Sequence, residues 1–445
     1  MEFNPRGEVK PVSKVLTEPG RPGRTGRLPI SSHIPKFRRN FWLFLAACLL
    51  AFIGIGVQGV ILNLYFLSVG YREDFLGFFS LANTAGIGGA ALIAGTLSNR
   101  LGPRRTLIGA AALFGVSSAG MLASTDQTFL YVLAIINGVS LAHIFVPTAT
   151  YVMDNADPND RSTAYAAYFA AQSAAMVIGS YLGGAMPSLV ASTNIDERHS
   201  YLLTLLVGAG LAFLGCFPLL FADDSKAGGS QATRIQVGSA VSQRRQMYRD
   251  VRWMIGSNFL IAVSMGAAIP FLNVFFSVQL GAQTNQIGLI FALGSGAMVV
   301  ASVVGPILAR RFGIVPTIVA GRLLTGPAFL ALAFSASIPV GATFYVLRTL
   351  FTNLTWPVDN AFTMELVRPD FRSTLAGLRT ASWNIAWAMA SGLGGLMIVQ
   401  FGFLSIFATA AVFGIAGSLV YLYAFHARVP TAVTDQPAMP VVSDG

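Results

Sequence analysis

The chain has 445 residues, of which 54% are hydrophobic and only 11% charged, and its mean hydropathy is +0.63. Soluble domains carry roughly 25% charged residues, so this composition excludes an ordinary soluble protein and predicts one that crosses a membrane several times. The net charge is +10, but 24 of the 29 Lys and Arg fall in segments that alternating spans would place on one side, and only Arg72 and Arg198 fall on the other. This asymmetry follows the positive-inside rule, so the basic charge indicates topology rather than a nucleic-acid partner.

The first half begins with residues 1–39, which hold nine Lys or Arg and no apolar periodicity and predict a disordered basic tail in the cytoplasm. Apolar runs that predict membrane-spanning helices then lie near 41–69, 75–97, 105–124, 128–153, 163–190 and 200–222. Each reaches the ~20 residues that a helix needs to cross the hydrocarbon. The first run is too long for the apolar part of a cleavable signal peptide, so we expect it to remain as the first span. Residues 40–222 are therefore predicted to form a six-helix bundle.

The second half follows a polar segment at 223–253, in which Gly, Ser and Gln precede four arginines. This segment predicts a cytoplasmic linker that ends in a short basic helix at the membrane surface. Six further apolar runs lie near 254–279, 286–309, 315–336, 342–366, 374–398 and 402–425 and predict a second bundle over 254–425. Residues 426–445 are polar and predict a second disordered tail. An even number of spans places both termini in the cytoplasm.

The fifth and eleventh runs repeat one another. Arg161-Ser-Thr opens a stretch that ends at Met186, and Arg372-Ser-Thr opens one that ends at Met397, 211 residues further on. Both stretches end in Leu-Gly-Gly-x-Met. A duplication at half the chain length, centred on membrane spans, indicates a transporter built from two related halves. The predicted fold is therefore an all-α polytopic membrane protein with twelve transmembrane helices in two pseudo-symmetric six-helix bundles.

The loop between the second and third runs carries a recognisable motif, Gly-Thr-Leu-Ser-Asn-Arg-Leu-Gly-Pro-Arg-Arg over 95–105. It resembles the loop motif of the major facilitator superfamily, Gly-x-Leu-x-Asp-Arg-x-Gly-Arg-Arg, with Asn99 in place of the Asp and Pro103 in place of a basic residue. A weaker copy stands at 306–313, between the eighth and ninth runs. The resemblance covers residues 40–425 and implies a secondary transporter whose two halves give alternating access to a central cavity.

Acidic residues close the cytoplasmic ends of the fourth and tenth runs at the same offset of 211 residues, as Asp154 and Glu365. The family resemblance implies that an acid at this place forms ion pairs with the arginines of the preceding loop. Such ion pairs would close the cytoplasmic side of the transporter. The alternative is that both acids lie in water at helix ends. The predicted cytoplasmic gate consists of Arg100, Arg104, Asp154, Arg310, Arg311 and Glu365.

A glycine motif lies in the fifth run, Gly-Ser-Tyr-Leu-Gly-Gly at 179–184. It resembles the family's antiporter signature Gly-Pro-x-Leu-Gly-Gly, with Ser180 in place of the Pro, and it favours export. The eleventh run carries the related Ala-Ser-Gly-Leu-Gly-Gly at 390–395. Small residues at this spacing let two helices approach closely, so helix packing is the predicted role. The predicted packing glycines are Gly179, Gly183, Gly184, Gly394 and Gly395.

Asp359 is the only one of the 19 acidic residues that falls well inside a predicted span. The short side chain of an aspartate inside a span cannot reach the membrane–water interface as the long side chain of a lysine can. Its carboxylate must therefore be paired with a cation, hydrated in a cavity or neutralised. Arg348 and Thr355 share a helix face with Asp359, but Arg348 lies ~16 Å away along that face, too far to pair directly. The resemblance places this helix on the cavity, so we expect Asp359 to carry a coupling proton and Arg348 to meet polar or anionic substrate groups. The alternative is a structural ion pair of Asp359 with Arg379 or Arg322.

Other polar and aromatic residues lie in spans that line the cavity in the family. The further candidates for substrate contacts are Gln58, Asn63, Asn137, His143, Gln172, Asn258, Asn273, Trp383, Asn384 and Trp387. The competing interpretations are hydrogen bonds between helices for the amides and packing or lipid contact for the aromatic rings.

Signatures of catalysis are missing from the sequence, which has no Walker loop, no paired His/Glu metal spacing and no serine elbow. The two cysteines, Cys48 and Cys216, both lie in apolar runs, which argues against a disulfide or a cysteine-bound metal. The sequence therefore predicts no enzyme, no cofactor and no metal site, and it gives no support to pumping driven by ATP.

The predicted function is proton-coupled export of an apolar or amphipathic small molecule by a monomer in the plasma or inner membrane. The expected partners are the lipid bilayer, the substrate and protons, without nucleic acid. One alternative is uptake of a small organic solute by proton symport or facilitated diffusion, with Arg348 binding a carboxylate or a sugar. The other is a membrane receptor or assembly protein that uses the same fold without transport.

Overall fold

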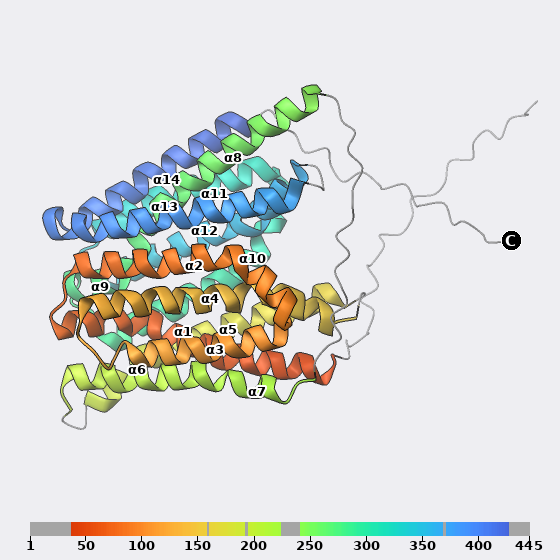
Figure 1. Cartoon of the computed structure of the whole chain (residues 1–445). Coiled ribbons are helices and arrows are strands. Elements are labelled where there is room, and N and C mark those ends of the chain that lie inside the picture. Colours follow the sequence, from red (N-terminus) through yellow and green to blue (C-terminus); the bar gives the residue numbers. More distant parts are fainter. Residues whose placement is uncertain (1–36, 158–159, 192–194, 224–240, 368–370, 427–445) are drawn as a thin grey trace, which may run out of the picture. The chain divides into compact units, whose positions relative to one another are not determined.

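The computed structural model describes residues 37–157, 160–191, 195–223, 241–367 and 371–426, and every regular element in these ranges is a helix (Figure 1). The first bundle comprises α1 (Arg39–Val69), α2 (Glu73–Leu101), α3 (Pro103–Gly120), α4 (Gln127–Asn155), α5 (Arg161–Ala191), α6 (Glu197–Leu214) and α7 (Cys216–Leu220). The second comprises α8 (Val241–Ala268), η1 (Ile269–Phe271), α9 (Leu272–Val274), η2 (Phe275–Gln279), α10 (Thr284–Phe312), α11 (Ile314–Ala333), α12 (Ile338–Glu365), α13 (Arg372–Phe401) and α14 (Phe403–Phe425). The all-α fold predicted from the sequence is confirmed.

The twelve predicted spans each correspond to helix, and two of them are interrupted. The sixth is divided into α6 and α7 at Gly215, and the seventh runs through α8, the 3₁₀ turn η1, α9 and the π-helical turn η2. Pro270 lies in η1, where a residue without an N–H cannot continue the α-helical ladder. Ten of the described helical segments are long and apolar enough to cross a membrane on their own, and α3 and α12 complete the set. The hydropathy of α12 is lower because it contains Arg348 and Asp359.

The predicted tails and most of the predicted linker lie outside the described residues, at 1–36, 224–240 and 427–445. The helix expected at the end of the linker is continuous with the seventh span, because α8 already begins at Val241.

The turn glycines of the two loop motifs occupy equivalent places, 211 residues apart. Gly102 joins α2 to α3 with φ 86°, and Gly313 joins α10 to α11 with φ 93°. Residues with a side chain rarely adopt a backbone conformation with positive φ. Glycine at these two positions therefore allows the chain to leave one helix and start the next within a single residue.

The two bundles repeat the same helix packing. In the first, α1 packs on α5 and α6, α2 on α4, and α3 on α4 and α6. In the second, α8 packs on α13 and α14, α10 on α12, and α11 on α12 and α14. The duplication that the sequence shows in one pair of spans therefore extends to the arrangement of all twelve.

The bundles meet through α2 with α13 and through α5 with α10. We call the end that contains residues 70–72 and 280–283 the loop end, and the end where α1 begins and α14 ends the terminal end. At the loop end, one hydrophobic cluster includes residues of both bundles, such as Phe66, Phe79, Phe271 and Phe275. The remaining clusters each stay within one bundle and lie toward the terminal end. The two bundles therefore share a core at the loop end only.

Hydrogen bonds between the bundles also lie at the loop end and form a reciprocal pair. Asn63 of α1 donates to the carbonyl oxygen of Pro270 (2.6 Å), and Asn273 of α9 donates to the carbonyl oxygen of Val60 (2.9 Å). The two amides also contact each other, with Asn63 Nδ2 3.2 Å from Asn273 Oδ1. A further bond between the bundles joins the hydroxyls of Ser188 on α5 and Thr284 on α10 at 3.3 Å.

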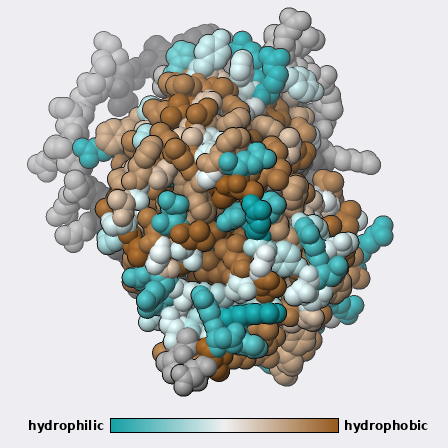
Figure 2. Space-filling view, turned by 90° about the vertical axis from the view of Figure 1, so that its left-hand side faces the viewer, coloured by the Kyte–Doolittle hydropathy of each residue, from teal (hydrophilic) through white to brown (hydrophobic). Residues whose placement is uncertain are grey.

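Two glycines of the repeated motif allow the closest approach between the bundles. A Cβ at Gly184 would lie 2.5 Å from Gly288 Cα, and a Cβ at Gly395 would lie 2.3 Å from the carbonyl oxygen of Glu73. A real side chain has no room in either place, so glycine is required for the loop end to close. Figure 2 looks onto this end and shows groups of hydrophilic residues with apolar surface between them.

Candidate functional site

A central cavity of about 660 Å³ lies between the two bundles. Residues of α1, α2, α3, α4 and α5 line one side, and residues of α8, η1, α9, α10, α12 and α13 line the other. Its wall is mostly apolar, with phenylalanine, methionine and tryptophan side chains, and amide and hydroxyl groups are spaced among them. Because the shared core closes the loop end, the cavity lies where the bundles separate toward the terminal end.

Arg348 on α12 is the only charged side chain among the described residues that line this cavity. It is 5% exposed, and no described carboxylate forms an ion pair with it. Its Nη2 donates to Thr349 Oγ1 (2.9 Å), and its guanidinium lies over the rings of Phe329 and Tyr345 at 5.3 and 5.5 Å. Its Nε is buried without a partner. The cavity therefore contains one buried positive charge that the described residues do not neutralise.

The polar wall of the first bundle is built from amides that bond to neighbouring helices. Asn137 of α4 donates to Ser117 and Ser118 of α3, both at 3.1 Å, and accepts from Asn83 of α2 at 3.2 Å. Gln58 of α1 accepts from Ser118 at 3.4 Å. These amides line the cavity and also hold its helices together, so the two interpretations left open by the sequence describe the same side chains.

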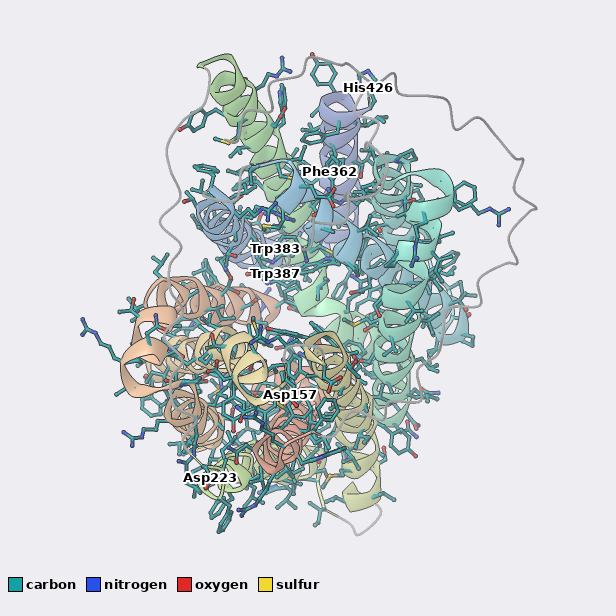
Figure 3. All side chains as sticks on the ribbon, turned by 90° about the vertical axis from the view of Figure 1, so that its right-hand side faces the viewer. Asp157, Asp223, Phe362, Trp383, Trp387 and His426 are labelled. Atoms are coloured by element: carbon teal, nitrogen blue, oxygen red, sulfur yellow. The ribbon has the colours of Figure 1, made fainter. Side chains whose placement is uncertain are left out.

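An aromatic wall faces them from the second bundle. Trp356 of α12 meets Trp383 of α13 edge-on at 5.5 Å, and Trp383 lies 6.0 Å from Trp387. Deeper in the cavity, Tyr345 stacks on Phe291 at 5.1 Å. Figure 3 looks onto the terminal end and shows Trp383 and Trp387 on the side of α13 that faces the first bundle.

A smaller side cavity of about 230 Å³ lies within the second bundle and contains Asp359. Asp359 Oδ2 lies 2.5 Å from Arg379 Nη2 and 3.0 Å from Arg322 Nη2, so the carboxylate pairs with both arginines named in the structural alternative. Arg322 also lies over the ring of Tyr421 at 4.8 Å. The amide of Asn258 lines the same cavity and donates to the backbone carbonyl oxygen of Arg379 (3.1 Å). Arg348 and Asp359 do not pair, as their spacing along the helix predicted.

The other predicted cavity residues are distributed unevenly. Asn63, Asn273, Trp383 and Trp387 line the central cavity, whereas Thr355 lines the side cavity. Three candidates line neither: Gln172 is half-buried, Asn384 donates to the carbonyl oxygen of Thr380 in its own helix (2.9 Å), and His143 Nδ1 contacts the carbonyl oxygen of Val139 (2.8 Å).

Within the described part of the chain, no ion pair joins the residues of the predicted gate to one another in this conformation. Among the described residues, Asp154 and Glu365 make no ion pair with the arginines of the preceding loops. Arg104 instead donates to the backbone carbonyl oxygens of Leu219 and Leu220 at the end of α7, at 2.8 and 2.9 Å. Arg100, Arg310 and Arg311 are exposed. Their role in a closed terminal end stays a prediction.

The packing glycines act in two directions. Gly179 and Gly183 lie against α1 of their own bundle, and Gly394 lies against α8 of its own bundle. Gly184 and Gly395, the second glycines of each pair, lie against the opposite bundle. The sequence predicted close packing at all of these positions. It did not predict which glycines lie in the contact between the two bundles and which lie within one bundle.

Residues that the sequence did not single out also line the central cavity, chiefly Asn83, Tyr345, Thr349, Asn353 and Trp356. Four of these belong to α12 and continue the face of Arg348 at helical spacings of three and four residues. This helical spacing from Arg348 is the sequence signal that could have identified these four residues as cavity-lining. Asn83 carried a weaker one, as an amide inside a predicted span.

Two helical bundles that enclose a central cavity, with amide and hydroxyl groups on a mostly apolar wall, and that share a core at one end define an integral membrane protein of the transporter class. The sequence profile of the Major Facilitator Superfamily matches residues 43–257 and again 254–442. The chain therefore belongs to the Major Facilitator Superfamily and is a membrane transporter of that type, with the lipid bilayer and a small-molecule substrate as its partners. The family resemblance stated from the loop motifs is confirmed.

Known relatives are distant. The chain is 22% identical over 329 residues to an uncharacterized MFS-type transporter, YceJ of Bacillus subtilis (strain 168), which covers 73% of this chain and 80% of that protein. It is 31% identical over 201 residues to the multidrug resistance protein MdtH of Photorhabdus laumondii, and 22% identical over 180 residues to a Na(+), Li(+), K(+)/H(+) antiporter of Planococcus maritimus. These two matches cover 44% and 39% of this chain, and 48% and 42% of the relatives.

Solved structures share the fold. The nucleoside transporter NupG superimposes with a TM-score of 0.71 at 12% identity, covering 88% of this chain and all of that chain. A bacterial homolog of the human lysosomal transporter Spinster, in an inward-facing and occupied conformation, superimposes with a TM-score of 0.67 at 13% identity, covering 86% and 96%. At these identities the likeness concerns the fold alone.

Proposed function

We propose that this transporter moves a small organic anion with an apolar body through the central cavity by alternating access. The observation that carries the proposal is Arg348, the single charge on the cavity wall, which has no carboxylate partner among the described residues. Burying an unpaired charge is costly, and an anionic ligand would supply the missing partner. The planar guanidinium matches the oxygens of a carboxylate, sulfonate or phosphate group.

The apolar body of the substrate is assigned to the aromatic wall. Trp356, Trp383 and Trp387 offer ring faces and edges on one side of the cavity, and Phe79 and Phe114 line the other. A cavity of about 660 Å³ lies within the ~300–1,000 Å³ typical of small-molecule sites. A compound that carries one anionic group on an aromatic or aliphatic body would fit this division.

The orientation belongs to the same proposal. The excess of Lys and Arg in alternate segments supports termini in the cytoplasm of a cell membrane, so the terminal end would face inward. The shared core at the loop end then supports an inward-open conformation, in which a monomer exchanges substrate with the cytoplasm.

Proton coupling is proposed at Asp359, the one acid among the described residues that line the side cavity, and we propose that protons move together with the anion. The second candidate is export of apolar compounds in exchange for protons. The aromatic wall favours it, and so does the likeness of part of the chain to proteins named multidrug resistance protein MdtH.

Uptake into proteoliposomes tests the proposed function. Aromatic and aliphatic carboxylates and sulfonates would be compared with lipophilic cations, for wild type, Arg348→Gln and the control Arg198→Gln, which removes an exposed arginine at the loop end, outside the predicted gate and both cavities. We expect transport of anions that falls by about tenfold or more in Arg348→Gln, because a buried charged hydrogen bond contributes about 1.5–3 kcal/mol, and that persists in the control. Transport of lipophilic cations, unchanged in Arg348→Gln, would contradict the proposal and favour the second candidate.

A further inference from the structure

The first bundle presents a polar surface to the central cavity at the same depth as Arg348. Asn83, Asn137 and Arg348 each lie ten residues after the first residue of their helices, α2, α4 and α12, which all begin at the loop end. At a rise of ~1.5 Å per residue, all three lie about 15 Å from that end. Asn137 also precedes Arg348 by the 211 residues of the internal repeat, so the two occupy equivalent places in opposite bundles. The amides of the first bundle therefore lie across the cavity from the buried charge of the second.

Gln58 of α1 offers a hydrogen-bond donor to this cavity. Its side chain is half-buried and lines the cavity wall. Oε1 accepts from Ser118, which holds the amide in place. Nε2 contacts the sulfur of Met121 at 3.9 Å, and a thioether is a weak acceptor. The N–H groups of Gln58 therefore have no strong acceptor among the described residues.

Asn83 of α2 offers the complementary acceptor. Its Nδ2 donates to the carbonyl oxygen of Ala134 at 3.1 Å and to Asn137 Oδ1 at 3.2 Å, whereas no described group donates to its Oδ1. Like Gln58, Asn83 is half-buried and lines the cavity. The two amides belong to one network, because Asn137 donates to the same Ser118 hydroxyl that Gln58 contacts. This network fixes both side chains and leaves one donor and one acceptor for a ligand.

We propose that Gln58 and Asn83 bind a second, uncharged polar group of the substrate. The substrate is then an organic anion whose apolar body carries a hydroxyl or carboxamide group at the end away from the anionic group. Such a group both accepts and donates, so it accepts from Gln58 Nε2 and donates to Asn83 Oδ1. An analogue without the group leaves these amide atoms unpaired and binds less tightly. The inference rests on the proposed function, because Arg348 positions the anionic end, and it adds the substituent that distinguishes the substrate from other apolar anions.

Calorimetric titration of the purified full-length protein in nanodiscs at pH 7 tests the inference. One probe is 2-naphthoate, and a second is 6-hydroxy-2-naphthoate, whose hydroxyl lies at the far end of the ring system from the carboxylate. The third, 3-hydroxy-2-naphthoate, is the control probe, because its hydroxyl lies beside the carboxylate. For wild type we expect the 6-hydroxy compound to bind about tenfold more tightly than 2-naphthoate, which equals ~1.4 kcal/mol and matches the net contribution of about one hydrogen bond. The 3-hydroxy compound should show no such gain.

Side-chain variants test whether the gain comes from the first bundle. Gln58→Met and Asn83→Leu should each remove the gain and keep the binding of 2-naphthoate, which also shows that the variant is folded. Gln172→Met is the matched control, because it makes the same change on α5 at a residue that lines neither cavity. Arg348→Gln should weaken the binding of 2-naphthoate and of the 6-hydroxy compound by about tenfold each and leave their ratio unchanged.

Three results would overturn the inference and leave the role of Arg348 standing: wild-type binding without the gain, an equal gain for the 3-hydroxy compound, or a gain that Gln58→Met and Asn83→Leu both leave unchanged. A gain that Gln172→Met removes as fully as Gln58→Met would also overturn it. Binding of all three probes that Arg348→Gln leaves unchanged would instead overturn the proposed function. If wild type binds none of the probes, both proposals fail.

Discussion

Replacing Gly395 by alanine is expected to push the two bundles apart at the loop end. The added Cβ would lie 2.3 Å from the carbonyl oxygen of Glu73, whereas ordinary van der Waals contact begins near 3.4 Å, so α13 and α2 must separate by about 1 Å. Overpacking of this kind costs about 1–3 kcal/mol. The cost falls only on the conformation in which the loop end is closed, so the equilibrium shifts toward the opposite conformation by about 5- to 150-fold.

Disulfide cross-linking measures this shift at a distance from the substitution. The hydroxyls of Ser188 and Thr284 are 3.3 Å apart across the other contact between the bundles, so cysteines there should join when the loop end is closed. In a background without Cys48 and Cys216, Gly395→Ala should slow the cross-link in proportion to the lost closed population. Gly394→Ala is the matched control, because its Cβ meets α8 of the same bundle. Equal slowing in both variants would refute the assignment of Gly395 to the contact between bundles.

Three further predictions concern the charged and polar side chains of the cavities. Arg348→Lys keeps the positive charge but loses the planar guanidinium donors, so the KM for an anionic substrate should rise about tenfold in transport kinetics while kcat changes little. If the variant shows the same kinetics as wild type, the guanidinium does not bind two oxygens of the anionic group at once. Asp359→Asn should lower the free energy of unfolding by about 3–5 kcal/mol, measured by thermal melting in detergent, because it leaves two buried arginines unpaired. Asp157→Asn breaks an exposed pair and should leave the melting temperature unchanged, so equal shifts would contradict the buried role of Asp359. Asn137→Ala should cost about 1–3 kcal/mol, because it leaves the serine hydroxyls of α3 without their donor, whereas Asn384→Ala, which breaks a bond within one helix, should change stability by less than ~0.5 kcal/mol.

The fold was predictable because its determinants are local. Span length, hydropathy and the repeat of 211 residues are properties of consecutive residues, and they gave twelve spans in two bundles. The interruption of the seventh span at Pro270 was less accessible, because proline within a membrane helix is tolerated in many places and its effect depends on neighbouring helices.

The site was predictable in part, because a membrane helix that is apolar on all sides does not show which face meets the cavity. Arg348 and Asp359 revealed the face of α12 through their charge. Gln172 carried no comparable signal about the face of α5, and the structure does not place it on either cavity. Trp356 was missed because an aromatic side chain serves equally well on a lipid-facing surface. The sequence could not identify which of Arg322 and Arg379 pairs with Asp359, because this depends on how α11 and α13 pack around α12. In the structure, Asp359 pairs with both arginines.

The reciprocal bonds of Asn63 and Asn273 give the closed end the geometry of an isologous dimer interface whose two partners belong to one polypeptide. Each amide donates to the carbonyl three residues before the other, so an approximate twofold axis passes between the two side chains. Such an interface is self-complementary, and loss of one amide leaves its counterpart still bonded to Val60 or Pro270. The covalent connection between the halves is thus not what aligns them at this end; the matching surfaces would define the same register if the two halves were separate chains.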